Sequence, residues 1–162
     1  MEFTRNKYFS HVVLVIVLLV CMILFCAACG SAEPERTIDL QALYNKLLQE
    51  TDTPEMFLLS SERVNKLYGI DASACPQAIF ATCSEGLRID EIWLVEAGTE
   101  DNAKEIETLA KGRADQLMHE TENYLPDQFV IAKQAVILRE GKTVALFISP
   151  DASKMAALFK TT

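Results

Sequence analysis

Hydrophobic residues are distributed very unevenly along this chain of 162 residues. Residues 12–28 form an uninterrupted apolar run, whereas later hydrophobic segments are short and are broken by polar residues. Beyond residue 38, apolar positions recur either at helical spacing or in short runs rich in β-branched and aromatic residues, a pattern typical of a globular domain. The pattern therefore divides the chain into an N-terminal leader and a folded remainder.

The leader has the order of residues found in a bacterial lipoprotein signal. Arg5 and Lys7 precede the apolar run, which ends in the small residues Ala27-Ala28-Cys29-Gly30. In such a signal, the cysteine takes a diacylglyceryl group and the leader is cut immediately before it. Two acyl chains anchor a protein stably, at about 0.8 kcal/mol per buried CH₂ group. We therefore expect Cys29 to be the site of lipidation and the chain to meet the membrane through it.

Two other interpretations of the leader stay open. The apolar run of 17 residues lies at the lower end of the roughly 17–25 residues that span a bilayer, so it could remain as a transmembrane helix. Alternatively, an ordinary cut after Ala28 would release a soluble protein. All three interpretations place the remainder outside the cytoplasm, because Arg and Lys precede the run. We expect residues 1–28 to be a signal peptide, 29–37 a tether beginning with the acylated cysteine, and 38–162 one extracytoplasmic domain at the outer face of the cell membrane.

The composition of the remainder limits its partners. Without residues 1–28, the chain keeps 134 residues, with 13 Lys and Arg against 22 Asp and Glu, a net charge of −9. This length supports one hydrophobic core rather than two. An acidic domain gains nothing from a phosphate backbone, so we do not expect it to bind nucleic acid. It is also repelled by an anionic membrane surface, so the lipid itself must hold the protein there.

Capping residues and apolar spacing predict four helices. The first begins after Asp39 and runs to Glu50, and the second is capped by Ser60 and closed by Gly69. The other two follow the segments 98–101 and 149–151. In addition, a proline at position 54 between Thr53 and Glu55 indicates a further helical turn.

Four strands are predicted from runs of β-branched and aromatic residues, and turn residues join them into two hairpins. The strands are residues 77–83, 89–96, 135–139 and 143–148. The resulting order, α-α-β-β-α-β-β-α, predicts an α+β domain with an antiparallel sheet of about four strands and helices packed mainly on one face.

Beyond the leader, the sequence contains few residues that could take part in catalysis. His119 lies near the end of the longest predicted helix, where Asp115, four residues earlier, could pair with it. A hydrolase or thiol enzyme would use His119 with Cys75 or Cys83, and this alternative stays open. We interpret His119 instead as an exposed residue at a helix end. The spacing of these residues does not resemble a metal site, and we expect no catalytic residue, metal or cofactor.

The two late cysteines, Cys75 and Cys83, could pair only if Cys75 folded back before the strand that contains Cys83. Free thiols are therefore the favoured interpretation, although export would permit a disulfide. The adjacent acids Asp90 and Glu91 do not form a converging pair, because neighbours in a strand point to opposite faces. We expect one of them to face solvent and the other to meet the backbone or Arg88.

Two loops are candidates for recognition. Tyr68 and Asp71 flank Gly69-Ile70, and Tyr124 precedes Leu125-Pro126, so each loop places a tyrosine beside permissive or rigid backbone. Loops on a firm scaffold often carry binding residues, and tyrosine offers contact area with a polar tip. The other interpretation is that each tyrosine closes an edge of the core.

Several short motifs occur in an order that resembles a known family. They are Leu67-Tyr68-Gly69-Ile70-Asp71, Asp90-Glu91-Ile92, Arg113 with Gln116, Tyr124-Leu125-Pro126, and the segment from Val144 to Ser149. Over roughly residues 38–160 the chain is similar to a family of small Gram-positive lipoproteins that carry the domain of unknown function 4358. The resemblance implies export, lipidation and one α+β domain, and it assigns no catalytic residue.

These observations predict a lipid-anchored extracytoplasmic protein that binds an unidentified envelope protein or ligand without catalysis. A solute-binding lipoprotein is a further possibility, which the size of the chain disfavours because one small domain has no cleft between two lobes.

Overall fold

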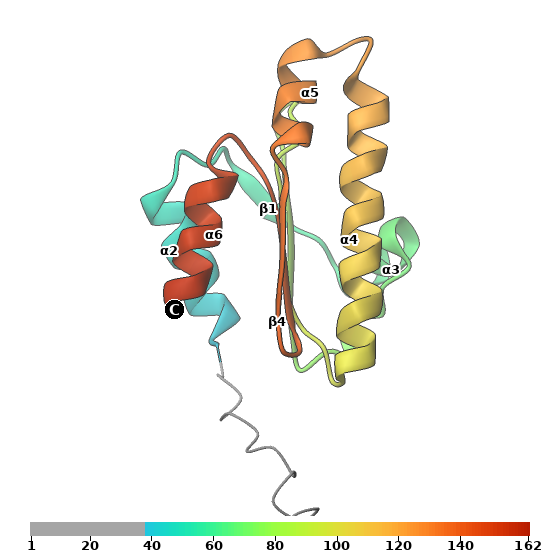
Figure 1. The fold of residues 1–162 in the computed structure, drawn as a ribbon, viewed down its shortest axis with the longest axis vertical. Helices are drawn as coiled ribbons and strands as arrows, with labels where there is room; N and C mark the ends of the chain where they lie inside the picture. The colour runs from blue at the N-terminus through green and yellow to red at the C-terminus, as the bar shows by residue number, and fades with distance from the viewer. Residues whose placement is uncertain (1–37) are drawn as a thin grey trace, which may run out of the picture. The chain divides into compact units, whose positions relative to one another are not determined.

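The computed structural model describes residues 38–162, so the predicted signal peptide, Cys29 and the tether lie outside the described residues. The described chain forms an antiparallel sheet with strand order β1-β2-β3-β5-β4, flanked by helices (Figure 1). The strands are β1 (Met56–Leu58), β2 (Gln77–Cys83), β3 (Glu91–Glu96), β4 (Val136–Glu140) and β5 (Thr143–Ile148). The helices are α2 (Leu40–Glu50), α3 (Ser61–Tyr68), the short 3-10 helix η1 (Ala72–Ala74), α4 (Glu100–Thr121), α5 (Pro126–Lys133) and α6 (Ala152–Thr161).

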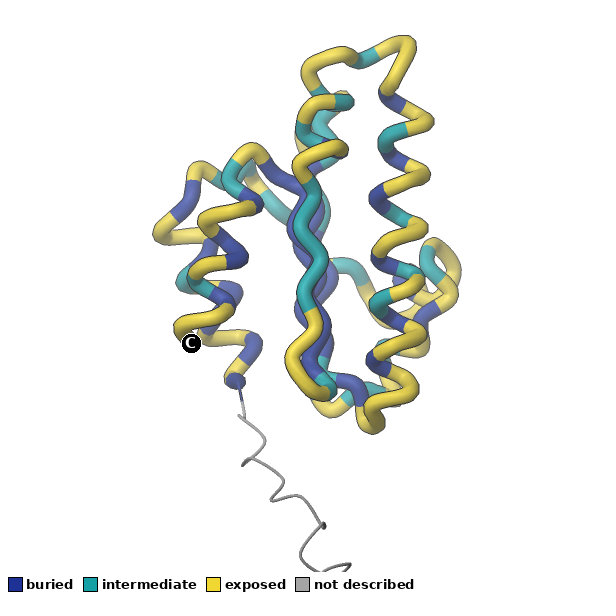
Figure 2. Tube along the Cα trace, viewed as in Figure 1, coloured by how far each residue is buried: buried dark blue, intermediate teal, exposed yellow. Residues whose placement is uncertain are grey.

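Helices cover both faces of the sheet. Helices α2 and α6 pack on one face, and α3, α4 and α5 pack on the other (Figures 1 and 2). Along β3, Ile92 and Leu94 enter the first core, whereas Trp93 and Val95 enter the second. The prediction that the helices pack mainly on one face is therefore wrong. The apolar runs of β3 and β5 are nearly continuous, and a strand of that kind needs cover on both sides.

The predicted α+β class and the antiparallel sheet are confirmed, with one strand more than the four expected. The additional strand is β1, which occupies the segment where Thr53, Pro54 and Glu55 indicated a helical turn. The extended conformation of β1 is set by its hydrogen bonds to β2. Because β2 lies far from β1 in the sequence, the local pattern of residues did not indicate this strand. Helix α5, which begins at Pro126, was also absent from the prediction.

The predicted helix ends are confirmed where a side chain or a glycine fixes them. Asp39 Oδ1 accepts a hydrogen bond from the Ala42 amide at 2.9 Å, and Ser60 Oγ accepts one from the Arg63 amide at 3.4 Å. Gly69 closes α3 with φ 72°, a left-handed conformation that other residues adopt only at a cost. Local chemistry therefore sets these boundaries.

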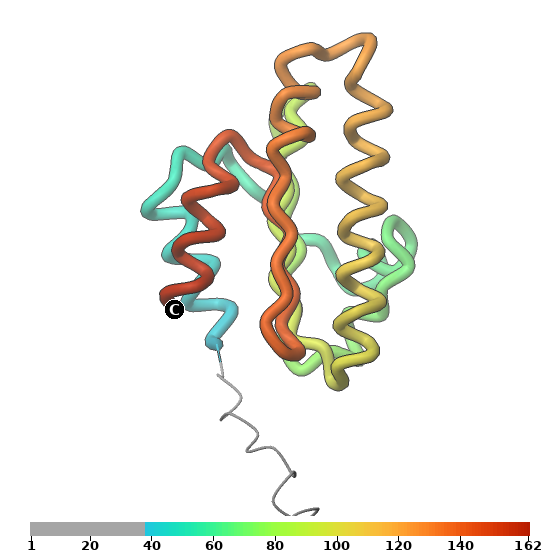
Figure 3. The backbone as a smooth tube through the Cα atoms, viewed as in Figure 1, coloured from blue at the N-terminus to red at the C-terminus, as the bar shows by residue number. Residues whose placement is uncertain are grey.

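Segments from opposite ends of the described chain lie side by side in α2 and α6 (Figure 3). Asp151 Oδ2 accepts a hydrogen bond from the Asp52 amide at 2.9 Å, which joins the start of α6 to the end of α2. Phe159 on α6 packs edge to face on Phe147 of β5, with ring centroids 6.4 Å apart. No helix within residues 38–162 combines the length and apolar character needed to cross a membrane.

Candidate functional site

An aromatic cluster forms where α3 ends above the sheet. The ring of Tyr68 lies 4.5 Å from the ring of Trp93 and 6.1 Å from that of Phe80, measured between centroids. Trp93 and Phe80 are almost completely buried on neighbouring strands, and they pair with each other across β2 and β3. Tyr68 is therefore held against the sheet, as the interpretation of an edge-closing residue anticipated.

A buried ion pair lies beside this cluster. Arg113 Nε on α4 donates to both carboxylate oxygens of Glu91, at 3.0 and 3.1 Å, and Arg113 Nη2 also donates to that carboxylate. The Tyr68 hydroxyl donates to Glu91 Oε2 at 3.4 Å, and the Arg113 guanidinium lies 5.5 Å from the centre of the Tyr68 ring. Three elements, α3, β3 and α4, are therefore joined at one point.

The surroundings of the ion pair shift the pKa values of Tyr68 and Arg113. Burial, followed by the negative charge of Glu91, raises the pKa of Tyr68 well above its ordinary value, and Arg113 only partly opposes this. Although burial lowers the pKa of Arg113, the hydrogen bonds and charge of Glu91 outweigh it, so the net change is upward. At neutral pH, Tyr68 is therefore neutral and Arg113 is charged.

The indole nitrogen of Trp93 is buried and makes no hydrogen bond among the described residues. A buried donor without a partner costs free energy, so the ion pair and ring contacts around it must offset that cost.

A half-open cleft lies next to the cluster, between the segment 69–75 and the N-terminal half of α4. Its volume is about 230 Å³. One wall is formed by the loop after α3 and by η1, and the other wall is formed by one face of α4. The lining residues are Gly69, Ile70, Asp71, Ala74 and Cys75 on the loop side, and Asn102, Glu105, Ile106 and Leu109 on α4.

Polar and apolar groups share the cleft. Asp71 caps η1 by accepting hydrogen bonds from the Ser73 hydroxyl at 2.5 Å and the Ser73 amide at 3.1 Å, and these bonds lower its pKa. Burial raises the pKa of the Cys75 thiol, and Asp71 adds to that rise, so the thiol is protonated at neutral pH. The cleft can therefore offer carboxylate and amide groups beside the apolar side chains of Ile106 and Leu109.

Of the three predicted recognition residues, the structure places Asp71 in the lining of the cleft, whereas Tyr68 does not line it but directly precedes the lining residue Gly69. Tyr124 lies elsewhere, in the turn between α4 and α5, and is 84% exposed. The α4 residues of the cleft were not predicted. Their spacing at positions 102, 105, 106 and 109 is that of one helical face, but exposed and apolar residues alternate on it, so it did not stand out as a site.

The possible catalytic residues do not come together. Cys75 faces the N-terminal half of α4, and His119 lies ten residues beyond Leu109, about 15 Å farther along the helix axis at 1.5 Å per residue. Cys83 follows Ile79 and Ala81 at two-residue spacing, so it points to the face of the sheet opposite α4. Both cysteines are free, and Asp115 makes no ion pair with His119 in the described domain.

The adjacent acids at the start of β3 are both buried, so the expectation that one faces solvent is wrong. Asp90 is 1% exposed and accepts two hydrogen bonds from Arg88, at 3.0 and 3.1 Å. The predicted partner Arg88 is therefore correct for Asp90, whereas Glu91 takes Arg113 from α4. Among residues 38–162, no group of three His, Cys, Asp or Glu side chains is placed to hold a metal ion.

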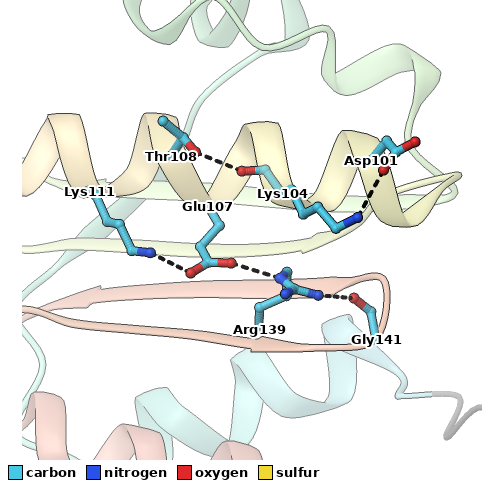
Figure 4. Close-up of polar contacts among 7 residues, drawn as sticks. All are labelled: Asp101, Lys104, Glu107, Thr108, Lys111, Arg139 and Gly141. Carbon is cyan, nitrogen blue, oxygen red and sulfur yellow. Dashed lines mark hydrogen bonds and ion pairs between the residues drawn. The ribbon is translucent and has the colours of Figure 1, made fainter.

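A second polar network fixes α4 to the sheet at the β4–β5 hairpin (Figure 4). Glu107 on α4 accepts from Lys111 Nζ at 2.5 Å and from Arg139 Nε on β4 at 2.7 Å. Hydrogen bonds from Lys111, and then from Arg139, lower the pKa of Glu107. One turn earlier on the helix, Lys104 Nζ lies 3.0 Å from Asp101. Helix α4, one wall of the cleft, is thus attached to β3 through Arg113 and to β4 through Glu107.

Comparison with known proteins places the domain in a family. The family model described as domain of unknown function (DUF4358) matches residues 49–149, which include every strand of the sheet, the Glu91–Arg113 pair and the cleft. No curated protein and no solved structure matches the chain. The match confirms the domain of unknown function 4358 that the sequence motifs indicated. The chain therefore belongs to the family defined by the domain of unknown function DUF4358.

Proposed function

We propose that this protein is a lipid-anchored extracytoplasmic module that binds an envelope protein or ligand and does not itself catalyse a reaction. The observation that carries the binding role is the half-open cleft between segment 69–75 and α4. The anchoring role depends on the leader and on Cys29, whose flanking small residues suit lipid attachment.

The walls of the cleft are firmly attached to the sheet, which favours recognition. One wall follows directly after Tyr68, whose ring packs on Trp93, and the other wall contains α4, which Arg113 joins to Glu91. A site whose walls are already ordered loses little conformational entropy on binding. This preorganisation supports a binding surface within a single domain.

The separation of the reactive residues favours binding over a thiol enzyme. Cys75 lines the cleft with a protonated thiol, and His119, the base that the thiol-enzyme alternative requires, lies toward the opposite end of α4. A base must reach its nucleophile within hydrogen-bond distance, directly or through one water.

The same cleft could take a small solute, so the solute-binding alternative differs only in the occupant.

The anchor is tested by metabolic labelling with a fatty acid in cells that make the full-length chain. We expect Cys29→Ala to abolish the label and the matched variant Cys26→Ala to retain it, because bulky Phe25 precedes Cys26. Undiminished label on the Cys29 variant would remove the lipid anchor from the proposal.

The binding site is tested by placing a photo-crosslinking amino acid on α4 in intact cells. Position 102 lines the cleft, whereas Thr108 is also exposed but lies on a different face of the same helix. We expect a defined crosslinked product from position 102 and none from position 108. Equal products from both positions, or none from position 102, would contradict a binding role for the cleft.

A further inference from the structure

We infer that the outer edge of β1 is a docking site for an extended basic segment of a partner protein, which adds to the sheet as a further strand. This inference rests on the proposed function and deepens it, because it names a second surface of the module and the chemistry of the partner.

The hydrogen bonds of β1 leave one side of the strand open. On its inner side, the Ser84 amide donates to the Glu55 carbonyl at 3.1 Å, and the Leu59 amide donates to the Phe80 carbonyl at 2.8 Å. Because bonded and non-bonded pairs alternate in an antiparallel ladder, the N–H and C=O groups of Met56 and Leu58 point away from β2. Within the described chain, no hydrogen bond engages these groups, so they can pair with an added strand.

Apolar side chains flank these free backbone groups on both faces. Phe57 is 39% exposed and Leu58 is 56% exposed. Phe57 lies on the face covered by α3, where the Arg63 guanidinium stands 6.0 Å from its ring centre, and Leu58 points to the opposite face. An added strand would therefore cover apolar surface on both sides of the sheet while it completes the ladder.

The other edge of the sheet is better protected. Strand β4 contacts α4 on one face and α6 on the other. Arg139 on β4 is also tied to Glu107, which keeps a charged side chain beside that edge. Short length, charged side chains and covering elements are the usual means by which proteins block edge strands. Strand β1 is short, but it carries no charged side chain of its own. Its three residues, Met-Phe-Leu, are all apolar.

The charge around β1 selects the partner. From residue 50 to residue 63 the chain contains four carboxylates and one cation, Arg63, whose guanidinium lies over the Phe57 ring. Glu85 follows directly after Ser84, the partner of Glu55, so the carboxylates near this edge outnumber Arg63. The four are Glu50, Asp52, Glu55 and Glu62, and like Glu85 none of them forms an ion pair in the described domain. A basic segment is attracted to this edge, whereas a second copy of the chain would bring carboxylate against carboxylate.

The test uses the full-length protein in detergent micelles and a fluorescent peptide of about eight residues, a common strand length, in which Lys and Val alternate. We expect the peptide to bind and to slow hydrogen exchange in segment 55–59. A Glu–Val peptide tests the charge, and a Lys–Val peptide with proline in its centre tests the need for an extended strand with free amides. Neither should bind.

Matched variants locate the contact. Leu58→Ser and Leu67→Ser remove leucines that are 56% and 55% exposed, so they differ in position rather than in burial. We expect Leu58→Ser to raise the Kd of the peptide about tenfold. Leu67→Ser should leave the Kd unchanged. A double variant, Glu55→Gln with Glu62→Gln, should also weaken binding and reduce its dependence on salt.

Three results would overturn the inference. The first is equal binding of the Glu–Val peptide, and the second is binding that does not respond to Leu58→Ser. The third is a concentration-dependent dimer in light scattering that Leu58→Ser abolishes, because the edge would then serve a second copy. Each can occur while Cys29 is labelled and position 102 crosslinks, so failure here is distinguishable from failure of the proposed function.

Discussion

Arg113 on α4 binds both carboxylate oxygens of Glu91 on β3, and 22 residues separate the two in the sequence. Glu91 is 2% exposed, so this contact lies inside the layer between helix and sheet. The Tyr68 hydroxyl meets the same carboxylate, which places the end of α3 in the arrangement. The ion pair therefore holds the two walls of the cleft in register with the sheet.

Replacing Arg113 with methionine should destabilise the protein by about 3 kcal/mol, because Glu91 would remain buried without its partner. The double variant Arg113→Met with Glu91→Leu should recover most of that loss, since neither charge of this pair then remains. The measurement is the urea midpoint, with the slope of the transition checked for constancy.

The matched control for this pair is Lys104→Met, which breaks the exposed pair with Asp101 on the same helix. We expect it to change the free energy of unfolding by less than about 0.5 kcal/mol. Equal losses from Arg113→Met and Lys104→Met would contradict the structural role assigned to the buried pair.

Alkaline pH should weaken the fold through Tyr68. Its pKa is raised in the folded state from the ordinary 10.0, so the folded protein retains a proton that the unfolded chain releases. The contribution of Tyr68 to stability is therefore complete below pH 10.0 and is lost as the pH rises above that value. Tyr68→Phe keeps the ring and removes the titration, so its stability should fall less steeply in this range.

The measurement is chemical denaturation at a series of alkaline pH values, together with tyrosinate absorbance. Burial also raises the pKa of Tyr44, so Tyr44→Phe provides a comparison in the other core. An alkaline slope that is identical in the wild type and in Tyr68→Phe would exclude the assigned environment of Tyr68.

Gly69→Ala should destabilise the domain by about 1–2 kcal/mol, the cost of a left-handed conformation for a residue with a Cβ atom. Gly69 has φ 72°, and a Cβ atom there would meet nothing within 4 Å, so the cost comes from the backbone alone. Gly98 is the matched control, because a Cβ atom there also meets nothing within 4 Å and its φ is not positive. Thermal unfolding should show Gly98→Ala unchanged or slightly stabilised, and the opposite ranking would refute the prediction.

Glu107→Gln should loosen α4 from the β4–β5 hairpin, with a loss of up to about 1 kcal/mol, because the side chains of its network are only partly buried. The pKa of Glu107 is lowered, so its contribution is present above the ordinary value of 4.5 and is lost as the pH falls below it. Urea denaturation between neutral and acidic pH measures this. Glu105 is exposed on the same helix and serves as the control. The stability of Glu105→Gln should fall at acidic pH as much as that of the wild type, whereas the stability of Glu107→Gln should fall less.

Most elements of the fold could be predicted because their signals are local. Asp39, Ser60 and Gly69 fix helix ends through bonds or torsions within a few residues of themselves. Residues 77–83 were predicted as a strand with the bounds that the structure shows, and the turn at Gly141 was also predicted. Segments whose neighbours decide their conformation were not predicted correctly: β1 forms because β2 offers it an edge.

The candidate site was predicted only in part, for the same reason. The loop of Tyr68 and Asp71 stood out in the sequence because a tyrosine and a glycine adjoin there. The opposite wall did not, because Asn102, Glu105 and Leu109 look like ordinary positions of an amphipathic helix. Only the packing of α4 across the sheet turns that helical face toward the loop.

Periodicity, capping residues and charge are properties of neighbours in the sequence, and by themselves they determined the α+β class, the hairpins and the acidic character of this chain. The tertiary structure decided which face each helix covers, which arginine neutralises Glu91, and which strand edge stays open. These depend on contacts between segments that are distant in the sequence, such as Glu91 with Arg113 and Phe57 with Thr82. Burial and pairing energies are set by those contacts, and no local pattern in the sequence records them.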